Sequence, residues 1–243
     1  MAPATLDDVL QIVRQQLNVS QVSGRITVTQ FNRALRHVIV SLHNDLVRKM
    51  EMDQEVSDDL RPFVVTLGSG LVPPLTVTNG QAELPEDYER LVVSHRKYAE
   101  PSAQCGTPQE IKTAIIRFYP TSKFYYRLSS TLFAPTRKRP IFTHENRLIT
   151  VAPSDITSIG FSYIRKPAIP FYDFIITGGA QVYLPPGAIH NGTNPAAVNG
   201  TPSRSVEIDF EAGMIPEIVN RLVAFMSVPK EAQLQIQTSG RNK

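Results

Sequence analysis

The sequence predicts an α+β protein in which N-terminal and C-terminal helices pack beside a central, mostly antiparallel β-region. Apolar residues recur with helical spacing near both ends of the 243-residue chain, and between them they alternate with polar residues as in strands. The 19 prolines fit short strands and ordered loops better than long helices. We expect an N-terminal helical part (residues 1–62), a β-rich part (63–210) and a C-terminal helix with a tail (211–243), forming one folded unit overall.

Two amphipathic helices are predicted in the N-terminal part. Thr5 is a suitable N-cap for the first, whose apolar face consists of Leu6, Val9, Leu10, Val13 and Leu17. The second is predicted over residues 29–50, with an apolar face of Phe31, Leu35, Val38, Leu42 and Leu46. These apolar helix faces must be buried, and the β-region, another helix of this chain or a neighbouring copy could cover them.

The β-rich part is centred on residues 134–167, where strand-forming residues are densest. Residues 140–143 and 147–151 flank the polar turn 144–146 and predict a hairpin, and residues 156–164 predict a further strand. The other predicted strands cover residues 63–67, 75–78, 91–94, 111–118, 171–176, 181–184 and 206–210.

Two more helices are predicted, over residues 121–132 and 215–227. Phe124, Leu128 and Leu132 form the apolar face of the first. The remaining features are tight turns at residues 79–80 and 178–179, a long loop at 185–203 and a polar tail at 230–243.

The composition and motifs argue against several kinds of chemistry. The single cysteine, Cys105, cannot form an intramolecular disulfide, and His37 and His43 lie six residues apart, which does not place two metal ligands on one helical face. Gly178-Gly179 lacks the Lys-Ser/Thr pair of a phosphate loop. We expect no catalytic, cofactor-binding or metal-binding residues, so the chain is not predicted to be an enzyme. It has no secretory-signal pattern and no apolar run near ~20 residues, so we expect synthesis in the cytoplasm and no membrane partner.

Basic residues form one constellation, which consists of Arg137, Lys138 and Arg139 with Arg165 and Lys166. The net charge of +3 is too small to indicate nucleic-acid binding by itself, so this local cluster matters. It could be a solvated strand end or face acidic groups of a partner. It could also contact DNA phosphates, which clustered Lys and Arg do without reading the sequence.

Several short motifs resemble those of phage neck proteins. They are Leu84-Pro85-x-Asp87-Tyr88, Ala134-Pro135, Pro140, Asn146-x-x-Ile149, Tyr163-Ile164-Arg165-Lys166-Pro167, and Val206-Glu207-Ile208-Asp209-Phe210 followed by a helix with Pro-Glu-Ile-Val. Over residues 84–227 the chain is similar to head-to-tail adaptor, or ring, proteins of short-tailed, crAss-like phages of Bacteroides-related bacteria. It is more distantly similar to the tail tubular protein A adaptors of podoviruses.

The resemblance implies a virion structural protein of the neck or tail, made in the host bacterial cytoplasm. About twelve copies would form a homo-oligomeric ring, a dodecamer. The ring would join the portal protein to other ring, tail or fibre proteins, and genomic DNA would pass through its lumen without sequence-specific binding. The basic residues would face that lumen or a partner, and docking to other chains is expected at Phe31, Leu35, Leu42, Gln233, Ile236, Arg241 and Lys243. The alternatives are a non-catalytic nucleic-acid-binding protein that uses the basic constellation, or a ring protein at a different level of the tail.

Overall fold

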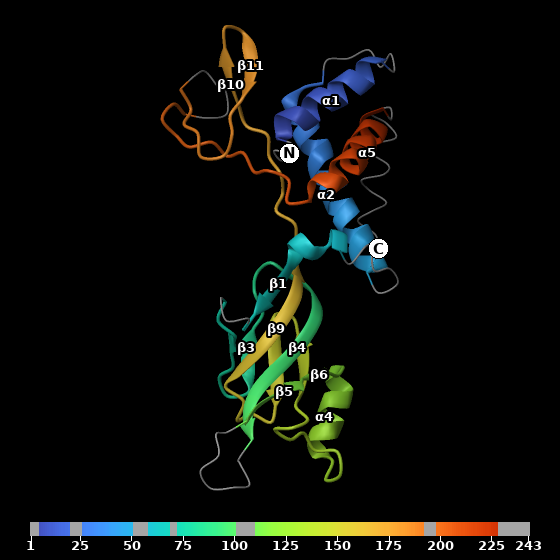
Figure 1. Cartoon of the computed structure of the whole chain (residues 1–243), viewed down its shortest axis with the longest axis vertical. Coiled ribbons are helices and arrows are strands. Elements are labelled where there is room, and N and C mark those ends of the chain that lie inside the picture. Colours follow the sequence, from blue (N-terminus) through green and yellow to red (C-terminus); the bar gives the residue numbers. More distant parts are fainter. Residues whose placement is uncertain are drawn as a thin grey trace. The chain divides into compact units, whose positions relative to one another are not determined.

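The computed structural model describes residues 5–19, 26–50, 58–68, 72–100, 110–191 and 198–227 (Figure 1). The predicted α+β class is confirmed, with about 35% helix, about 31% strand and mostly antiparallel sheets. Contacts divide the chain into a helical unit, Met1–Pro62 with Pro167–Lys243, and a β unit, Phe63–Lys166. Residues 167–210, which the sequence-based division places in the β-rich part, therefore group with the helices. The packing of helices beside the β-region as one folded unit stays a prediction.

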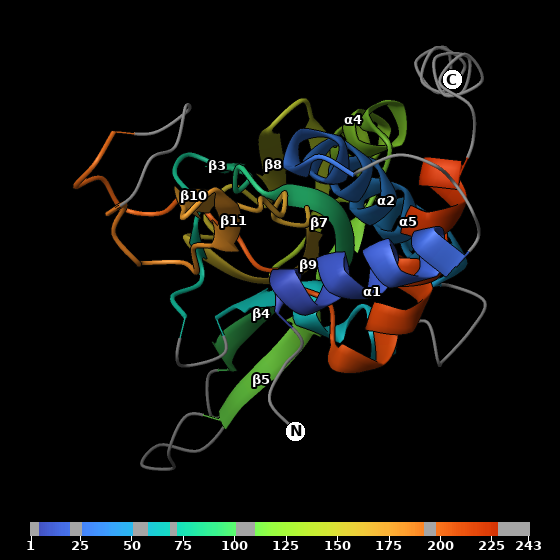
Figure 2. The ribbon, with the colours of Figure 1, turned by 90° about the horizontal axis from the view of Figure 1, so that it is seen from above.

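The described helices of the helical unit are α1 (Leu6–Val19), α2 (Val28–Lys49) and α5 (Ile215–Ser227). Thr5 caps α1 as predicted, because its hydroxyl accepts a hydrogen bond from Asp8 N at 3.3 Å. A capping box of Thr27 and Gln30 starts α2. Both α1 and α2 pack against α5 (Figure 2), and both predicted apolar faces are buried. No described helix is both long and apolar enough to span a membrane.

A short hairpin and a long connection complete the described part of the helical unit. Strands β10 (Phe174–Thr177) and β11 (Ala180–Tyr183) pair around the predicted turn, where Gly178 and Gly179 both have positive φ. The 3-10 turn η2 (Ala212–Met214) leads into α5.

The strand predicted over residues 206–210 is wrong. Val206 makes a single antiparallel bridge to Phe171, and no strand forms there. The segment is held by its acidic side chains instead, because Glu207 accepts from Leu6 N, the first main-chain donor of α1, and Asp209 accepts from Ala168 N.

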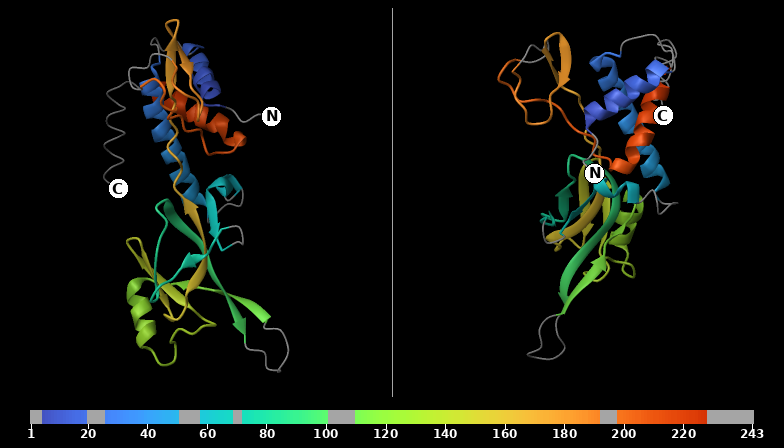
Figure 3. Two further views of the ribbon diagram at one scale, coloured as in Figure 1. Left: turned by 90° about the vertical axis from the view of Figure 1, so that its left-hand side faces the viewer. Right: turned by 45° about the horizontal axis from the view of Figure 1, so that its top comes forward.

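The β unit contains two sheets. The five-stranded sheet has the order β1 (Val64–Leu67), β9 (Ser158–Arg165), β4 (Tyr88–Glu100) and β5 (Glu110–Ile115), with β2 (Leu75–Thr76) also paired to β9. The four-stranded sheet has the order β3 (Gln81–Glu83), β8 (Leu148–Ala152), β7 (Ile141–Glu145) and β6 (Arg117–Phe118). Every pair is antiparallel except β6 with β7. Figure 3 shows β4 and β5 continuing as a long two-stranded ribbon.

The core of the β unit lies between these two sheets and contains side chains from residues 134–167, the segment with the densest strand signal in the sequence. Phe142, Ile149 and Val151 from one sheet and Phe161 and Tyr163 from the other belong to one buried cluster. The predicted hairpin is confirmed as β7–β8, although its turn is at Asn146 and Arg147, because Glu145 pairs with Leu148. The aromatic side chains of the stretch thus serve the core.

Candidate assembly surfaces and a buried polar network

Helix α4 (Thr121–Ser129) projects most of its large side chains away from the β unit. It follows the edge strand β6 and buries Phe124, which packs with Ile141 and Ala152. The next two residues are exposed, Tyr125 by 56% and Tyr126 by 72%. A nine-residue helix with one fully buried side chain is held mainly by that contact.

The predicted apolar face of this helix is wrong beyond Phe124. Leu128 is exposed, and Leu132 lies outside the helix with an exposed fraction of 88%. Serine side chains end the helix early: Ser129 Oγ donates to Tyr126 O, and Ser130 Oγ accepts from Phe133 N. The chain then turns back along residues 130–140 toward β7.

Residues 117–139 expose both apolar and basic side chains, and we call the exposed part of this segment the α4 surface. Its exposed apolar members are Phe118, Tyr125, Tyr126, Leu128, Leu132 and Phe133. Its basic members are Arg117, Lys123, Arg127, Arg137, Lys138 and Arg139, and residues 117–139 contain no Asp or Glu. The guanidinium of Arg127 lies 4.4 Å from the Tyr119 ring centroid and 5.8 Å from that of Phe133, which ties the helix to the returning loop.

The α4 surface was largely missed from the sequence. Sequence reasoning selected only Arg137, Lys138 and Arg139 from it. Counting charges over residues 117–139 would have revealed the one-sided charge, but exposure of the aromatic side chains has no sequence signal, because aromatics in this pattern are more often core.

The five basic residues singled out in the sequence do not come together within the β unit. Arg137 forms an ion pair with Asp155, which precedes the start of β9. Arg165 is the last residue of β9, and its guanidinium lies 5.5 Å from the Phe63 ring centroid. An eight-residue strand separates its ends by roughly 20 Å. The constellation therefore consists of two separate groups, 137–139 and 165–166.

The predicted docking residues divide into buried ones and ones outside the described part. Phe31 and Leu35 are 0% exposed and Leu42 is 2% exposed, so these three pack within the helical unit and present no surface to another chain. The prediction that these three side chains dock to other chains is therefore corrected, because another helix of the same chain covers the apolar face of α2. Gln233, Ile236, Arg241 and Lys243 lie outside the described residues, as does Cys105.

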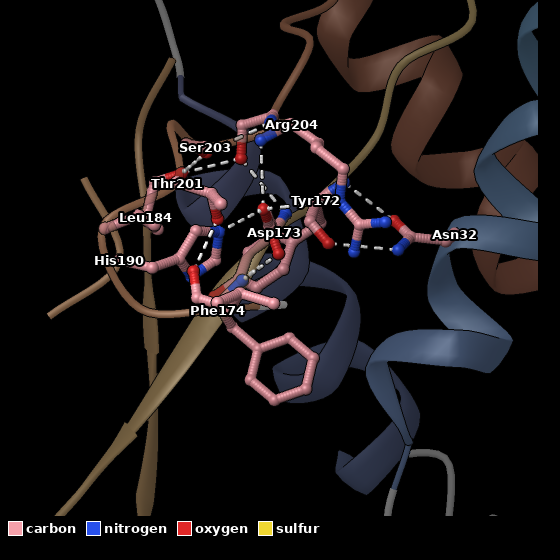
Figure 4. Close-up of polar contacts among 11 residues, drawn as sticks. Asn32, Tyr172, Asp173, Phe174, Leu184, His190, Thr201, Ser203 and Arg204 are labelled. Carbon is pink, nitrogen blue, oxygen red and sulfur yellow. Dashed lines mark hydrogen bonds and ion pairs between the residues drawn. The ribbon is translucent and has the colours of Figure 1, made fainter. Parts of the chain in front are cut away.

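A buried polar network anchors the connection after β11 (Figure 4). Asp173, just before β10, is 1% exposed, and its carboxylate accepts from Phe174 N, Arg204 N and His190 Nε2 at 2.9–3.0 Å. Ser205 Oγ accepts from Asp173 N and donates to Leu184 O. One carboxylate therefore fixes three segments that are distant in sequence.

Electrostatics in this network favour an ionised Asp173. Burial alone would raise the pKa of this carboxyl, but the main-chain N–H groups of Arg204 and Phe174 and the His190 ring together outweigh burial and lower the pKa. On the other side, Asn32 holds the main chain of Tyr172 through two hydrogen bonds, at 2.8 and 3.0 Å. The network is thus attached to α2.

The Asp–His pair has the composition of a catalytic pair but not its arrangement. His190 is 1% exposed, and within the described residues its Nδ1 has no hydrogen-bond partner. A nucleophile would have to lie at that nitrogen. The nearby hydroxyls of Ser203 and Ser205 donate to Leu184 O instead. The arrangement is suited to holding residues 184–191 and 198–205 in place.

The described residues contain no group of three or more His, Cys, Asp or Glu side chains arranged to hold a metal ion. Comparison of the sequence with protein-family models and with curated proteins finds no match. The features of this chain therefore have to be interpreted from its own residues.

Proposed function

We propose that this chain is a structural protein of a phage virion that forms a ring in the neck between the portal and the tail. The observation that supports an assembly role is the α4 surface, where six large apolar side chains are exposed within the short segment 118–133. Contiguous exposed apolar surface on a folded protein is typical of protein–protein contacts. The motif resemblance supports the specific place of that assembly.

In this proposal about twelve copies close into a ring through heterologous contacts, in which one surface meets a different surface of the next copy. The ring joins the portal protein to other ring, tail or fibre proteins, and genomic DNA passes through it without sequence-specific binding. The role is structural and needs no catalytic residue. The nucleic-acid-binding alternative is less well supported, because its basic constellation is divided between the two ends of β9.

The test is to locate the chain in virions. Purified particles that contain it should show it at the neck by electron microscopy with an antibody against the folded chain, and antibody against the major capsid protein serves as the positional control. Labelling confined to the portal vertex supports the proposal. Absence of the chain from particles purified to constant composition would overturn it.

A further inference from the structure

We infer that His95 and Gly160 form a cross-strand lock that fixes the direction in which the β4–β5 ribbon leaves its sheet. This inference does not depend on the proposed ring. Strand β4 pairs with β9 as far as His95, which lies opposite Gly160, and it pairs with β5 from His95, opposite Ile115, to Glu100. Among the described pairs, His95 is the one β4 residue that is paired with both neighbouring strands. It therefore lies where the ribbon departs (Figure 3).

Two irregularities in β4 precede this point. The register with β9 shifts between Tyr88 and Arg90 and again between Leu91 and Val93. Such shifts are typical of β-bulges, which bend the strand and increase its twist. The pairing is regular from Val93 to His95, and beyond His95 the strand pairs with β5 alone. A two-stranded ribbon is only marginally stable in water, so its direction depends on what holds its base.

The His95 ring holds that base by lying directly on Gly160. A Cβ atom added to Gly160 would come closer than 3.0 Å to three atoms of the ring, Nε2, Cε1 and Cδ2. A glycine inside a strand often marks a close approach of this kind, and an aromatic ring above it covers the main chain that glycine leaves bare. Ser94 Oγ donates to Gly160 O at 3.4 Å, so two consecutive residues of β4 contact the same glycine.

The ring is also confined on its other side. Residues directly opposite one another in an antiparallel pair have side chains on the same face of the sheet. The His95 side chain therefore shares a face with Gly160 on β9 and with Ile115 on β5. If the ribbon swung about this point, the ring would be lifted off Gly160. The contact thus favours a single ribbon direction.

Paired spin labels on the full-length chain test the lock. Cys105→Ser removes the single cysteine, and labelled cysteines replace Thr113 of β5 and Glu83 of β3, which are both exposed. The parent chain should give one narrow distribution of distances in double electron–electron resonance. His95→Ala removes the ring and Gly160→Ala displaces it, so each should broaden this distribution. Each should also speed hydrogen exchange of residues 110–115 at least about tenfold.

Three further variants separate the lock from a general loss of stability. His95→Phe keeps a ring over Gly160 and should keep the distribution narrow. In the double variant His95→Ala with Gly160→Ala the added methyl group meets no ring, so it should behave like His95→Ala alone. Gly213→Ala is the matched control, because a Cβ atom there meets nothing within 4 Å. A distribution that stays narrow in His95→Ala, or that broadens equally in His95→Phe, would overturn the lock and leave the proposed ring standing.

Discussion

Replacing Asp173 tests whether the buried network holds residues 184–191 and 198–205 in place. Asp173→Ala leaves three donors without their acceptor: Phe174 N, Arg204 N and His190 Nε2. A buried donor that loses its partner costs about 1–3 kcal/mol. The costs of the three donors overlap because the donors share one carboxylate. We therefore expect the free energy of unfolding of the helical unit to fall by about 3 kcal/mol.

The pH dependence of this effect has a defined sign. Because the folded chain lowers the pKa of Asp173, its stabilising contribution is present above the ordinary carboxyl value of 3.8 and is lost as the pH falls through the lower folded pKa. Wild type and Asp173→Asn should therefore differ in stability at neutral pH, and the difference should narrow as the pH falls below 3.8.

The assay combines urea unfolding with hydrogen exchange measured by mass spectrometry, since the two units can unfold separately. Peptides that cover residues 184–191 and 198–205 should lose protection in Asp173→Ala, while peptides from β7 and β8 should not. Glu211→Ala is the matched control, because Glu211 is exposed, precedes η2 and makes no side-chain cap bond. It should change stability by less than about 0.5 kcal/mol. Equal unfolding midpoints and equal protection in Asp173→Ala and Glu211→Ala would refute the anchoring role.

Three further predictions concern the β unit. Tyr163→Phe removes a hydrogen bond to Asp87 Oδ1 and should lower the free energy of unfolding by about 1 kcal/mol. Burial and Asp87 raise the pKa of Tyr163 to about 12. In unfolding curves recorded at alkaline pH, the difference between wild type and variant should therefore persist below pH 10 and vanish as the pH approaches 12. At Asn146, φ is +54°, which glycine adopts readily and a β-branched side chain does not. Asn146→Gly should therefore leave the free energy of unfolding nearly unchanged, and Asn146→Val should lower it by about 1–3 kcal/mol in thermal unfolding. Equal melting temperatures of the two variants would contradict the left-handed conformation of this turn residue. Phe124→Ala should lower the free energy of unfolding in urea by about 3–5 kcal/mol, because Phe124 is fully buried. Tyr126→Ser should change it by less than about 0.5 kcal/mol and weaken assembly in light scattering, because Tyr126 is exposed. The reverse order of effects would mean that α4 packs through its other face.

Regular elements with one-sided apolar patterns could be predicted from the sequence. The faces of α1 and α2 were correctly identified because a helix that buries one face against a neighbour must repeat apolar residues at that spacing. The β7–β8 hairpin was identified for the equivalent reason in strands. What covers a buried face depends on the whole fold. Sequence could not decide between α5 and a neighbouring copy as the cover of α2.

The candidate surfaces were harder to predict, for physical reasons that differ from case to case. Arg139 and Arg165 were grouped because both belong to the stretch 134–167, but the extended strand β9 within that stretch separates its two ends. Asp173 and His190 are brought together by a loop with no periodic pattern, so no local signal links them. Leu132 is exposed because serine hydrogen bonds end α4 first, a competition that apolar spacing does not register.

The most direct test of the proposed ring is the mass and symmetry of the assembled chain. Purified full-length protein should be measured by native mass spectrometry across a range of concentrations, and its largest stable species should be imaged by electron microscopy. The proposal predicts a closed ring of about twelve copies with one rotational axis, as heterologous contacts require. A species that remains a monomer, or a two-fold dimer in which the same surface of both copies meets, would contradict it.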